Sequence, residues 1–267
     1  MRWIVGDIHG MFRALDALIN RIEQRDSAAQ FIFVGDYVNR GPDSPKVIER
    51  LLHLPNAKFL RGNHDDILDL ILHDKCHARH HAVPDGVMAF CWFMQHGLEQ
   101  TLVAYGADAA ELEYLATHPH PAKIRKAMEV IPPRHRQFIS ELQSVVEYPD
   151  IFVTHAFWDP DETDTSPDIS ERLAAKPALR YQNLWGRFTT EQIRRPKRWS
   201  RTGYFGHTPV QNYLATETLE PLRGPRIVLV DTAAALVTYG RLSAVCAETG
   251  EVLQVDRAGK IPVNGVR

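Results

Sequence analysis

Short apolar stretches alternate with longer stretches of helical periodicity through the first quarter of the chain. Three of the short runs have the residue types of β-strands: RWIV at 2–5, FIFV at 31–34 and KFL at 58–60. After each of them, leucine and isoleucine recur at three- and four-residue spacing, which is typical of helices. The expected helices lie at Phe12–Arg25, after Pro42 and Pro45, and from Asp65 and Asp66 onward. Residues 1–73 therefore predict a βαβαβ unit with right-handed crossovers.

The pattern changes twice further along the chain. Residues 74–148 have mostly helical character and contain no strong strand, so we interpret them as a helical cap inserted into a single domain that spans 1–267. Apolar strands return from residue 151: IFVTH, YFGH, RIVLVDT, ALVTY, RLSAVCA and EVLQVD. The last few are short, alternate in polarity and are separated by turn residues such as Thr249–Gly250. They predict an antiparallel second sheet.

Polar residues of metal-ligand type directly follow several of these strands. The segments GDIHG (6–10), GDYVNRG (35–41) and RGNHD (61–65) follow the three early strands, and the late strands IFVTH and YFGH each end in a histidine. Seven side chains are concerned: Asp7, His9, Asp36, Asn63, His64, His155 and His207. Open α/β sheets hold their reactive groups at the carboxyl ends of the strands, so we expect all seven to converge at one sheet edge.

Composition and charge narrow the class of protein. A chain of 267 residues with 44% hydrophobic residues can bury a sizeable core, and its net charge of −2 creates no general attraction for nucleic acid or membrane. The three cysteines have no close metal-binding spacing, which favours a reducing compartment. The first strand begins at Arg2 and leaves no room for a signal peptide, and no apolar run approaches the roughly 20 residues of a membrane span. We therefore expect a cytoplasmic protein without a membrane partner or a stable nucleic-acid partner.

The converging side chains indicate hydrolysis of phosphate esters with two metal ions. That reaction needs neutralised phosphate charge and a nucleophile at neutral pH, and two divalent ions about 3.5–4 Å apart supply both. We expect Asp36 to bridge the ions, because it lies between the other ligand motifs. The remaining ligands would be Asp7 and His9 for one ion, and Asn63, His155 and His207 for the other. Mixed oxygen and nitrogen ligands favour Mn²⁺, with Fe or Zn²⁺ as alternatives, over Ca²⁺.

The motifs GDxHG, GDxVxRG, GNH with Asp or Glu, a strand-terminal His and GHT follow one another in this order. In this respect the chain resembles the phosphoprotein phosphatase family of calcineurin-like metallophosphoesterases, from Gly6 to Asp231–Thr232. The bacterial branch of that family includes small Ser/Thr phosphatases and symmetrical diadenosine tetraphosphatases. The resemblance implies an α/β fold, an α/β/β/α sandwich that holds a dinuclear site.

The resemblance also implies roles for residues that do not bind metal. His64 would be the general acid for the leaving group, Arg40 a phosphate clamp, and Arg187, in LWGR, a second clamp. These roles fit the chemistry of the side chains, because a guanidinium group can bind phosphate through two parallel hydrogen bonds.

Two positions depart from the pattern of the protein phosphatases. Asn39 stands where they have an Asp that pairs with the catalytic His, so a cationic His64 should be less favoured here. A general acid matters most for a poor leaving group such as a serine alkoxide, and less for a nucleotide that leaves from a phosphoanhydride. The symmetrical diadenosine tetraphosphatases also lack an acid at this position. Phe157 stands where the family has Gly, and it would either contact an aromatic part of the substrate or belong to the core.

We therefore predict a hydrolase in which a metal-bound hydroxide attacks phosphorus directly. The leading substrate class is phosphomonoesters, including phosphoserine and phosphothreonine in proteins. The alternative is a dinucleoside polyphosphate such as diadenosine tetraphosphate, or capped RNA. A third hypothesis is a non-catalytic phosphate-binding module, against which the complete ligand set argues.

Two other clusters have less specific interpretations. His73, His77, His80 and His81 lie close to Cys76, and a solvated helix explains them better than a third metal site. The basic run Arg194–Arg201 contains Trp199 and is typical of a solvated loop over an anionic-substrate site, although it could also bind an acidic peptide, a nucleotide tail or RNA.

Overall fold

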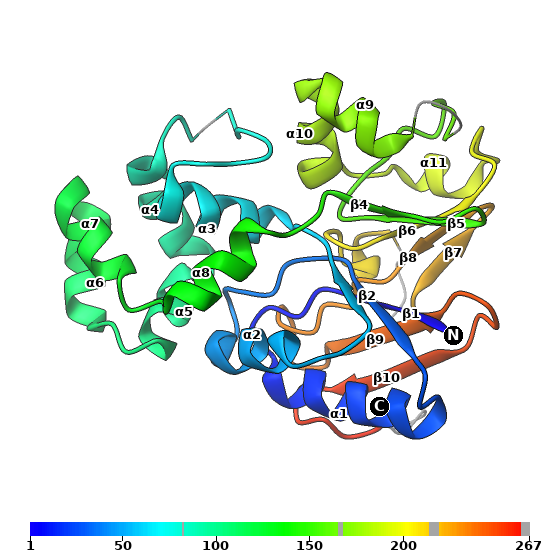
Figure 1. Ribbon diagram of the computed structural model, residues 1–267, viewed down its shortest axis with the longest axis horizontal. Coiled ribbons are helices and arrows are strands. Elements are labelled where there is room, and N and C mark those ends of the chain that lie inside the picture. Colours follow the sequence, from blue (N-terminus) through cyan, green and yellow to red (C-terminus); the bar gives the residue numbers. More distant parts are fainter. Residues whose placement is uncertain (82, 165–167, 214–218, 263–267) are drawn as a thin grey trace.

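Two five-stranded sheets face each other in the computed structural model, which describes residues 1–81, 83–164, 168–213 and 219–262 (Figure 1). The first sheet has the order β10 (Val252–Asp256), β9 (Arg241–Cys246), β1 (Arg2–Val5), β2 (Gln30–Phe33) and β3 (Ala57–Phe59). The second has the order β4 (Val145–Glu147), β5 (Ile151–Thr154), β6 (Thr202–Phe205), β8 (Ile227–Leu229) and β7 (Leu222–Gly224).

Helices cover the outer faces of both sheets and extend from one end of the molecule (Figure 1). Those near the first sheet are α1 (Phe12–Arg25) and α2 (Ser44–Leu52), whereas α3 (Asn63–His73) packs against the helical group on the left of Figure 1. The group on the left of Figure 1 contains α4 (Gly86–Phe93), α5 (Glu99–Ala104), α6 (Ala109–Thr117), α7 (Pro121–Met128) and α8 (Pro133–Ser140). Those above the second sheet are α9 (Ile169–Ala175), α10 (Pro177–Trp185) and α11 (Thr190–Arg194), and a short 3₁₀ turn lies at Val210–Asn212.

Alternation of side chains along the strands produces the layers. In β1, Trp3 and Val5 pack towards the helices of the first sheet, whereas Ile4 packs into the interface between the sheets. In the second sheet, Val153 of β5 belongs to the same interface and Phe152 packs towards α9–α11. Successive residues of a strand point to opposite faces, so both sheets bury apolar side chains on both faces. The result is the α/β/β/α sandwich that the sequence predicted.

The first three strands and helices also agree with the sequence prediction. Strands β1, β2 and β3 are parallel, with Ile4 opposite Ile32 and Phe33 opposite Phe59. Helices α1, α2 and α3 lie where leucine and isoleucine recur at helical spacing, and they bury most of those residues, although Leu52 at the end of α2 is exposed. The βαβαβ unit is therefore confirmed.

The prediction for the last strands was wrong in its pairing. Strands β9 and β10 do not form an antiparallel second sheet but extend the first sheet, where Val5 pairs antiparallel with Ala244. The second sheet is mixed, with β5, β6 and β8 parallel and antiparallel strands at its two edges. The sequence of β9 is compatible with a place in either sheet, because both of its faces are apolar and buried. Leu242 and Ala244 face helices, and Val245 faces the interface between the sheets.

Two local predictions also need correction. ALVTY at 235–239 is a turn and not a strand, and its side chains Leu236 and Tyr239 are exposed. The preceding Ala233 has a φ of 61°, a conformation that turns the chain away from extended geometry. Helices α9, α10 and α11, between β5 and β6, were not predicted from the sequence.

Residues 74–148 contain helices α4–α8, as the helical pattern predicted, and end in strand β4. Helices α4 and α5 are separated by a break at Met94–Leu98, where Gly97 has a φ of 94°. A Cβ atom at Gly97 would lie 2.2 Å from the backbone nitrogen of Arg40, so only glycine fits there. The interpretation of this region as an inserted cap stays a prediction. Each helix in the described part of the chain is too short or too polar to cross a membrane.

A buried ionic cluster attaches these helices to the first sheet. Arg61 Nη1 lies 3.2 Å from Asp66 Oδ1 and 2.7 Å from Asp69 Oδ2, and Arg61 Nη2 donates to two carbonyl groups at the end of α8. Asp66 also accepts hydrogen bonds from the backbone N–H groups of His77 and Ala78. Burial raises the pKa of Asp66 to about 6, although Arg61 opposes this effect. Asp66 thus joins α3, the segment after it and α8.

We expect Asp66→Ala to destabilise the protein by about 3–5 kcal/mol, because the change removes one partner of a buried ion pair and leaves two backbone N–H groups without an acceptor. Urea unfolding followed by circular dichroism measures this loss. The exposed Glu113 of α6 provides a control, and Glu113→Ala should change the free energy of unfolding by less than about 0.5 kcal/mol. Equal effects of the two substitutions would contradict an anchoring role for Asp66.

Candidate dinuclear metal site

Five loops that follow strands bring the candidate ligands together. Asp7 and His9 follow β1, Asp36 follows β2, and Asn63 and His64 begin α3 after β3. His155 follows β5 and His207 follows β6, so the second sheet contributes as well. All seven of these residues are buried except His207, which is partly buried. The structure therefore places the seven residues at one end of the sandwich, as expected for groups at the carboxyl ends of strands.

The ligand-type atoms form two groups that share Asp36. One group contains His9, Asp36 and His64, and the other contains Asp36, His155 and His207, with the ligand atoms of each group within 4.8 Å of one another. Asn63 Oδ1 joins the second group, 2.9 Å from His207 Nδ1 and 3.1 Å from His155 Nε2. The shared carboxylate is the one expected to bridge two ions.

Asp7 lies where the two sheets meet at the site. Its carboxylate accepts the backbone N–H of His207, with distances of 3.0 and 3.2 Å to its two oxygens, and it is outside the group formed by His9 and Asp36. A Cβ atom at Gly206 would lie 2.1 Å from Asp7 Oδ1, so the close approach requires glycine. Asp7 thus joins the first sheet to the second at the site. Its assignment as a ligand, like those of the other six residues, stays a prediction.

The protonation states of the histidines show that the site fits cations. His9 Nδ1 lies 2.9 Å from the carbonyl oxygen of Val38, and His155 Nδ1 lies 2.8 Å from that of Val34. A carbonyl oxygen can only accept, so Nδ1 carries the proton in each ring and Nε2 presents a lone pair. These lone pairs face the oxygens of Asp36 at 3.3 and 3.6 Å. Arg40 Nη1, 2.7 Å from His9 Nε2, already brings positive charge to one of these lone pairs, and a metal cation could accept both of them together with the Asp36 carboxylate.

Buried charge supports the same conclusion. Burial lowers the pKa of His9 well below its ordinary value, so the ring is neutral, and burial raises the pKa of Asp36 to about 7. The pKa of Asp7 is also raised well above its ordinary value, first by burial and then by the charges of Asp231 and Asp36. Several buried carboxylates that repel one another are stabilised by divalent cations, which reverse these pKa shifts. Neutral imidazole and carboxylate are also the forms in which these side chains bind metals.

The backbone is strained at several of the same residues. His9, Asp36 and His207 have φ angles of 47°, 56° and 65°, and Asn39 and Arg40 have φ angles of 70° and 66°. Such angles cost non-glycine residues about 1–3 kcal/mol and persist only where the surrounding contacts impose them. The surrounding contacts therefore fix the directions of these side chains.

Two acidic residues at the site were not identified from the sequence. The carboxylate of Asp65 accepts the backbone N–H groups of Asp36, Tyr37 and Gly62 at 2.8, 3.1 and 2.9 Å, and thereby holds two ligand loops together. Its place at the third position of α3 is a capping-box signal that could have revealed this role. Asp231 is buried after β8, and its charge acts on Asp7 and Asp36. In the sequence, the only sign of a place for Asp231 at the site is its position at the end of the predicted strand RIVLVD.

Asn39 contacts His64 and is held by helix α5. Its Nδ2 lies 2.9 Å from His64 Nδ1, and its Oδ1 accepts the hydroxyl of Thr101 at 3.1 Å. Thr101 Oγ1 in turn accepts the backbone N–H of Asn39 at 2.8 Å. In this orientation the amide donates to Nδ1, so a neutral His64 carries its proton on Nε2, the nitrogen that faces the metal site, and Arg40 Nη2, which can only donate, makes no hydrogen bond to that nitrogen in this tautomer. Burial, together with the charges of His9 and Arg40, lowers the pKa of His64 well below its ordinary value.

The two candidate phosphate clamps lie on different sides of the site. Arg40 Nη1 is 2.7 Å from His9 Nε2, and Arg40 Nη2 is 3.1 Å from His64 Nε2. Arg187 is exposed and donates from Nη1 to Thr208 Oγ1 at 3.0 Å, directly beside His207. The two guanidinium groups therefore lie beside different ligand groups of the candidate site, Arg40 beside His9 and His64 and Arg187 beside His207.

Other candidates from the sequence are not brought to the site. Phe157 is only 9% exposed and packs on Phe188 with ring centroids 4.6 Å apart, so it is a core residue and its expected substrate contact has no support. Among the described residues, the histidines near Cys76 form no group of ligand atoms that could hold a metal. In the basic run, Arg201 pairs with Asp164 and Glu147 and Trp199 is buried, so these residues serve the fold.

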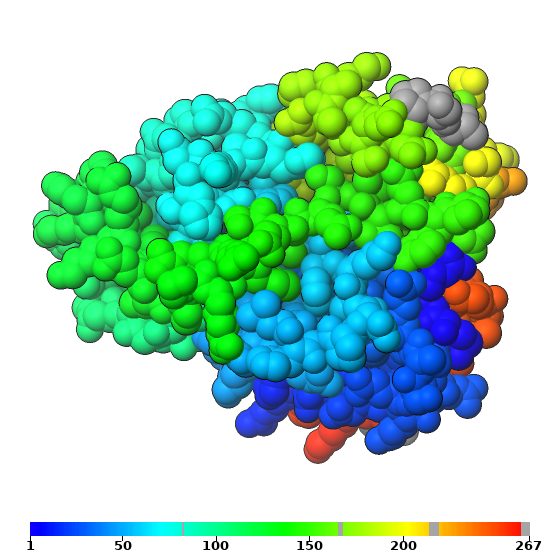
Figure 2. All heavy atoms as spheres, in the orientation of Figure 1, coloured from blue at the N-terminus to red at the C-terminus, as the bar shows by residue number. Residues whose placement is uncertain are grey.

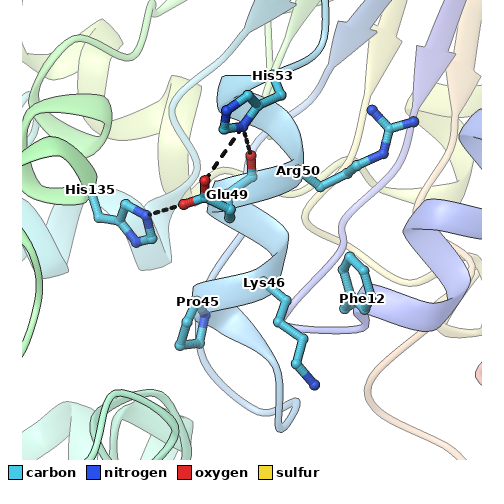
Figure 3. Close-up of a pocket in the computed structure, with 7 residues that line it drawn as sticks. All are labelled: Phe12, Pro45, Lys46, Glu49, Arg50, His53 and His135. Atoms are coloured by element: carbon cyan, nitrogen blue, oxygen red, sulfur yellow. Dashed lines mark hydrogen bonds and ion pairs between the residues drawn. The ribbon is translucent and has the colours of Figure 1, made fainter.

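A cavity of about 630 Å³ lies elsewhere on the surface (Figure 3). Glu49 stands at its centre between His53 and His135, and Phe12 and Lys46 form another part of its wall (Figure 3). None of the residues that line it belongs to the candidate metal site. This cavity is therefore separate from the chemistry described above.

Comparison with known proteins gives a family and several relatives. Residues 2–186 match the model of the calcineurin-like phosphoesterases. The symmetrical bis(5'-nucleosyl)-tetraphosphatase of Coxiella burnetii is 40% identical over 63 residues, which is 24% of this chain and 22% of that protein. Serine/threonine-protein phosphatase 2 of Escherichia coli K12 is 38% identical over 63 residues, 24% of this chain and 28% of that protein. The matched segments thus span less than a third of these curated relatives.

One solved structure, a candidate diadenosine tetraphosphatase, superposes on 99% of this chain and 94% of its own with a TM-score of 0.55 and 22% identity. At this identity the likeness concerns the fold alone.

Replacing the shared carboxylate tests the two-ion arrangement. Asp36→Asn removes the charge between the two groups of ligands, and we expect loss of bound metal together with loss of phosphoesterase turnover. Metal analysis of the purified proteins measures the first effect, with two ions expected per active wild-type chain. Asp161→Asn, at an exposed carboxylate that pairs with Arg195, is the control and should retain both ions. A wild-type enzyme that is active with at most one ion per chain would contradict the dinuclear assignment.

Proposed function

Since this chain belongs to the calcineurin-like phosphoesterase family, we propose that it hydrolyses phosphate esters or phosphoanhydrides at the site around Asp36. The family uses a dinuclear divalent metal centre, and the His and Asp groups of this site fit one. We further propose Mn²⁺ as the working ion, with Fe or Zn²⁺ as alternatives, because the site combines imidazole with carboxylate and amide oxygen. A cytoplasmic location and a phosphorylated small molecule or protein as the substrate complete the proposal.

The residues proposed to hold the ions divide between the two sheets. Loops of the first sheet supply Asp7, His9, Asp36 and Asn63, and loops of the second supply His155 and His207. Asp7 and His9 are proposed for one ion and Asn63, His155 and His207 for the other, with Asp36 shared. Two bound divalent ions supply a nucleophile at neutral pH and neutralise charge on the phosphate oxygens. The protein's contribution is to fix these ligands by Nδ1 hydrogen bonds to carbonyl groups and by Asp65.

Arg40 and Arg187 are proposed to orient the phosphate group. The guanidinium group of Arg40 now faces the lone pair of His9 Nε2 and the N–H of His64, and an anionic phosphate would be a better acceptor for it than either neutral ring. Movement of Arg40 towards phosphate frees His64 Nε2, which then faces the leaving group with its proton. His64 is therefore proposed to protonate the leaving oxygen.

The contact between Asn39 and His64 carries our proposal for the substrate. Asn39 supplies a neutral amide where a carboxylate would favour the imidazolium, so His64 donates its proton from the less acidic, neutral ring. Such a donor suits a leaving group of low basicity. A nucleotide released from a phosphoanhydride is of this kind, and we propose a dinucleoside polyphosphate as the substrate. The relative from Coxiella burnetii, by its name, acts on this class of compound.

Hydrolysis of phosphoserine and phosphothreonine in proteins is the second candidate function. The similarity to serine/threonine-protein phosphatase 2 favours it, although that match covers only 24% of this chain. Incubation of one Mn²⁺-loaded preparation with a phosphoserine peptide, p-nitrophenyl phosphate and diadenosine tetraphosphate distinguishes the two. A kcat/KM that is highest for the phosphoserine peptide would overturn the anhydride proposal.

Removal of either clamp should reduce catalysis. We expect Arg40→Ala and Arg187→Ala each to lower kcat/KM by about 10²-fold or more, because a charge-assisted contact with the transferred phosphate is lost. Steady-state kinetics with diadenosine tetraphosphate measures the loss. Arg195→Ala is the matched control, because Arg195 is a surface residue that pairs with Asp161, and it should behave as wild type. Wild-type kinetics for Arg187→Ala would remove Arg187 from the site.

Restoring the acid at position 39 should change the preference for leaving groups. Asn39→Asp gives His64 a charged partner and should accelerate hydrolysis of phosphoserine peptides by roughly 10-fold or more, because general acid catalysis is worth about 10²–10⁴-fold for such substrates. Rates with diadenosine tetraphosphate should change little. Comparison of kcat for the two substrates before and after the substitution provides the measurement. An equal effect on both substrates, or no effect on either, would show that Asn39 does not tune His64.

A further inference from the structure

We propose that Trp92 and Trp185 form a binding subsite for the purine base of a nucleotide substrate, beside the metal site. This inference rests on the proposed function, because it assumes that phosphate binds between Arg40 and Arg187. It goes beyond that function in assigning the recognition of the base to two residues of different helices, Trp92 of α4 and Trp185 of α10. Neither residue was singled out in the sequence.

A continuous series of ring contacts connects the two tryptophans to the histidines of the site. Trp185 meets His207 edge to face, with ring centroids 6.3 Å apart. Trp92 meets Phe93 at 5.2 Å, and Phe93 in turn meets His64 at 5.0 Å. The two indoles stack on each other with centroids 5.9 Å apart and an interplanar angle of 27°. A base on this surface is therefore close to both halves of the candidate metal site.

Exposure distinguishes these two rings from the other tryptophans. The chain has five tryptophans, and three of them, Trp3, Trp158 and Trp199, are at most 2% exposed. Trp92 and Trp185 are the two that remain partly exposed, and they are in contact with each other. Both rings also pack against the main core, and the ring of His80 lies 4.7 Å from that of Trp92 and 4.6 Å from that of Trp185, so a base would contact the part that these neighbours leave uncovered. Part of their aromatic surface is available for stacking.

The surroundings suit a planar ligand attached to phosphate. Arg187 follows Trp185 by two residues and lies beside His207, so a cation for phosphate adjoins the aromatic surface. Trp185 Nε1 is buried and has no hydrogen-bond partner among the described residues. The buried Nε1 atoms of Trp3 and Trp158 are likewise without a partner among the described residues, so the argument for a base rests on the exposed ring faces and not on this N–H. Aromatic stacking accepts any base, because each base has a π face.

The subsite joins two parts of the fold that are distant in sequence. Tyr181 and Trp185 of α10 approach the segment after α3. The ring centroids of Tyr181 and His81, a residue of that segment, are 4.7 Å apart. In Figure 1 this segment extends towards α10, and in Figure 2 the cyan and yellow-green atoms of the two regions adjoin on the face shown. Base binding would thus use a surface that exists only where the helical region and α10 meet.

The first test measures binding of two phosphomonoesters, and an assay of released phosphate in the same samples checks that they are not hydrolysed. Quenching of tryptophan fluorescence by AMP, with ribose 5-phosphate as the ligand that lacks a base, gives the two dissociation constants for the metal-loaded protein. We expect wild type to prefer AMP by about 5- to 150-fold, the range that corresponds to stacking of one base. Trp185→Leu, which keeps an apolar side chain and removes the ring, should reduce this preference to about twofold or less; for this variant, calorimetry replaces fluorescence. Equal affinity of wild type for the two ligands would overturn the subsite.

The second test uses kinetics and controls for folding. Trp185→Leu and Trp92→Leu should each raise KM for diadenosine tetraphosphate and leave kcat/KM for a phosphoserine peptide within about twofold of wild type. Trp185→Phe retains a smaller ring and should have an intermediate KM, which provides a result if the leucine variant does not fold. Tyr114→Leu, at an exposed ring of α6, is the control and should match wild type. Equal losses on both substrates, or a larger loss with a phosphotyrosine peptide, would contradict the assignment.

The two tests also separate this inference from the proposed function. A protein that prefers AMP to ribose 5-phosphate but hydrolyses neither diadenosine tetraphosphate nor phosphopeptides would have the subsite and lack the function. A protein that hydrolyses these substrates and shows no preference for AMP would have the function and lack the subsite.

Discussion

The arrangement of the candidate site depends on the buried carboxylate of Asp65, whose hydrogen bonds at the site are with backbone N–H groups. Asp65 accepts three backbone N–H groups, those of Asp36, Tyr37 and Gly62, and so fixes the loops after β2 and β3 against each other. Burial raises the pKa of Asp65 to about 7, with the charge of Asp36 acting in the same direction. The loops are therefore held by an acceptor whose ionised form is costly without nearby positive charge. Binding of cations would lower this cost and strengthen the three hydrogen bonds together.

The site also depends on the docking of the two sheets. His155 and His207 come from the second sheet, and their partners Asn63 and Asp7 come from segments attached to the first. Neither sheet holds a complete set of ligands. Cations shared between the sheets would act as a link across the apolar interface, so that metal affinity and the stability of the sandwich are coupled.

The sequence predicted the parts of this protein in which local pattern determines structure. Apolar runs followed by polar ligand motifs indicated β1–β3 and the convergence of the seven candidate ligands, since parallel strands end at a common edge. The pattern did not determine which sheet receives β9 and β10, because Val245 and its neighbours are buried on both faces in either case. Asp231, Trp92 and Trp185 also escaped notice. Their proximity to the site arises from long-range packing, which no local spacing records.

The helical region and the catalytic loop share backbone hydrogen bonds at two successive residues. The N–H of Asn39 is held by Thr101, and the N–H of Arg40 donates to the carbonyl of Gly97 at 3.2 Å. Insertions between strands usually diverge freely in length and sequence, because they rest on the surface of a core. Here, the segment around Gly97 and Thr101 cannot drift in this way without moving Asn39 and Arg40. A chimera that exchanges residues 86–104 with those of another phosphoesterase would therefore change the positions of Asn39 and Arg40 along with the helices.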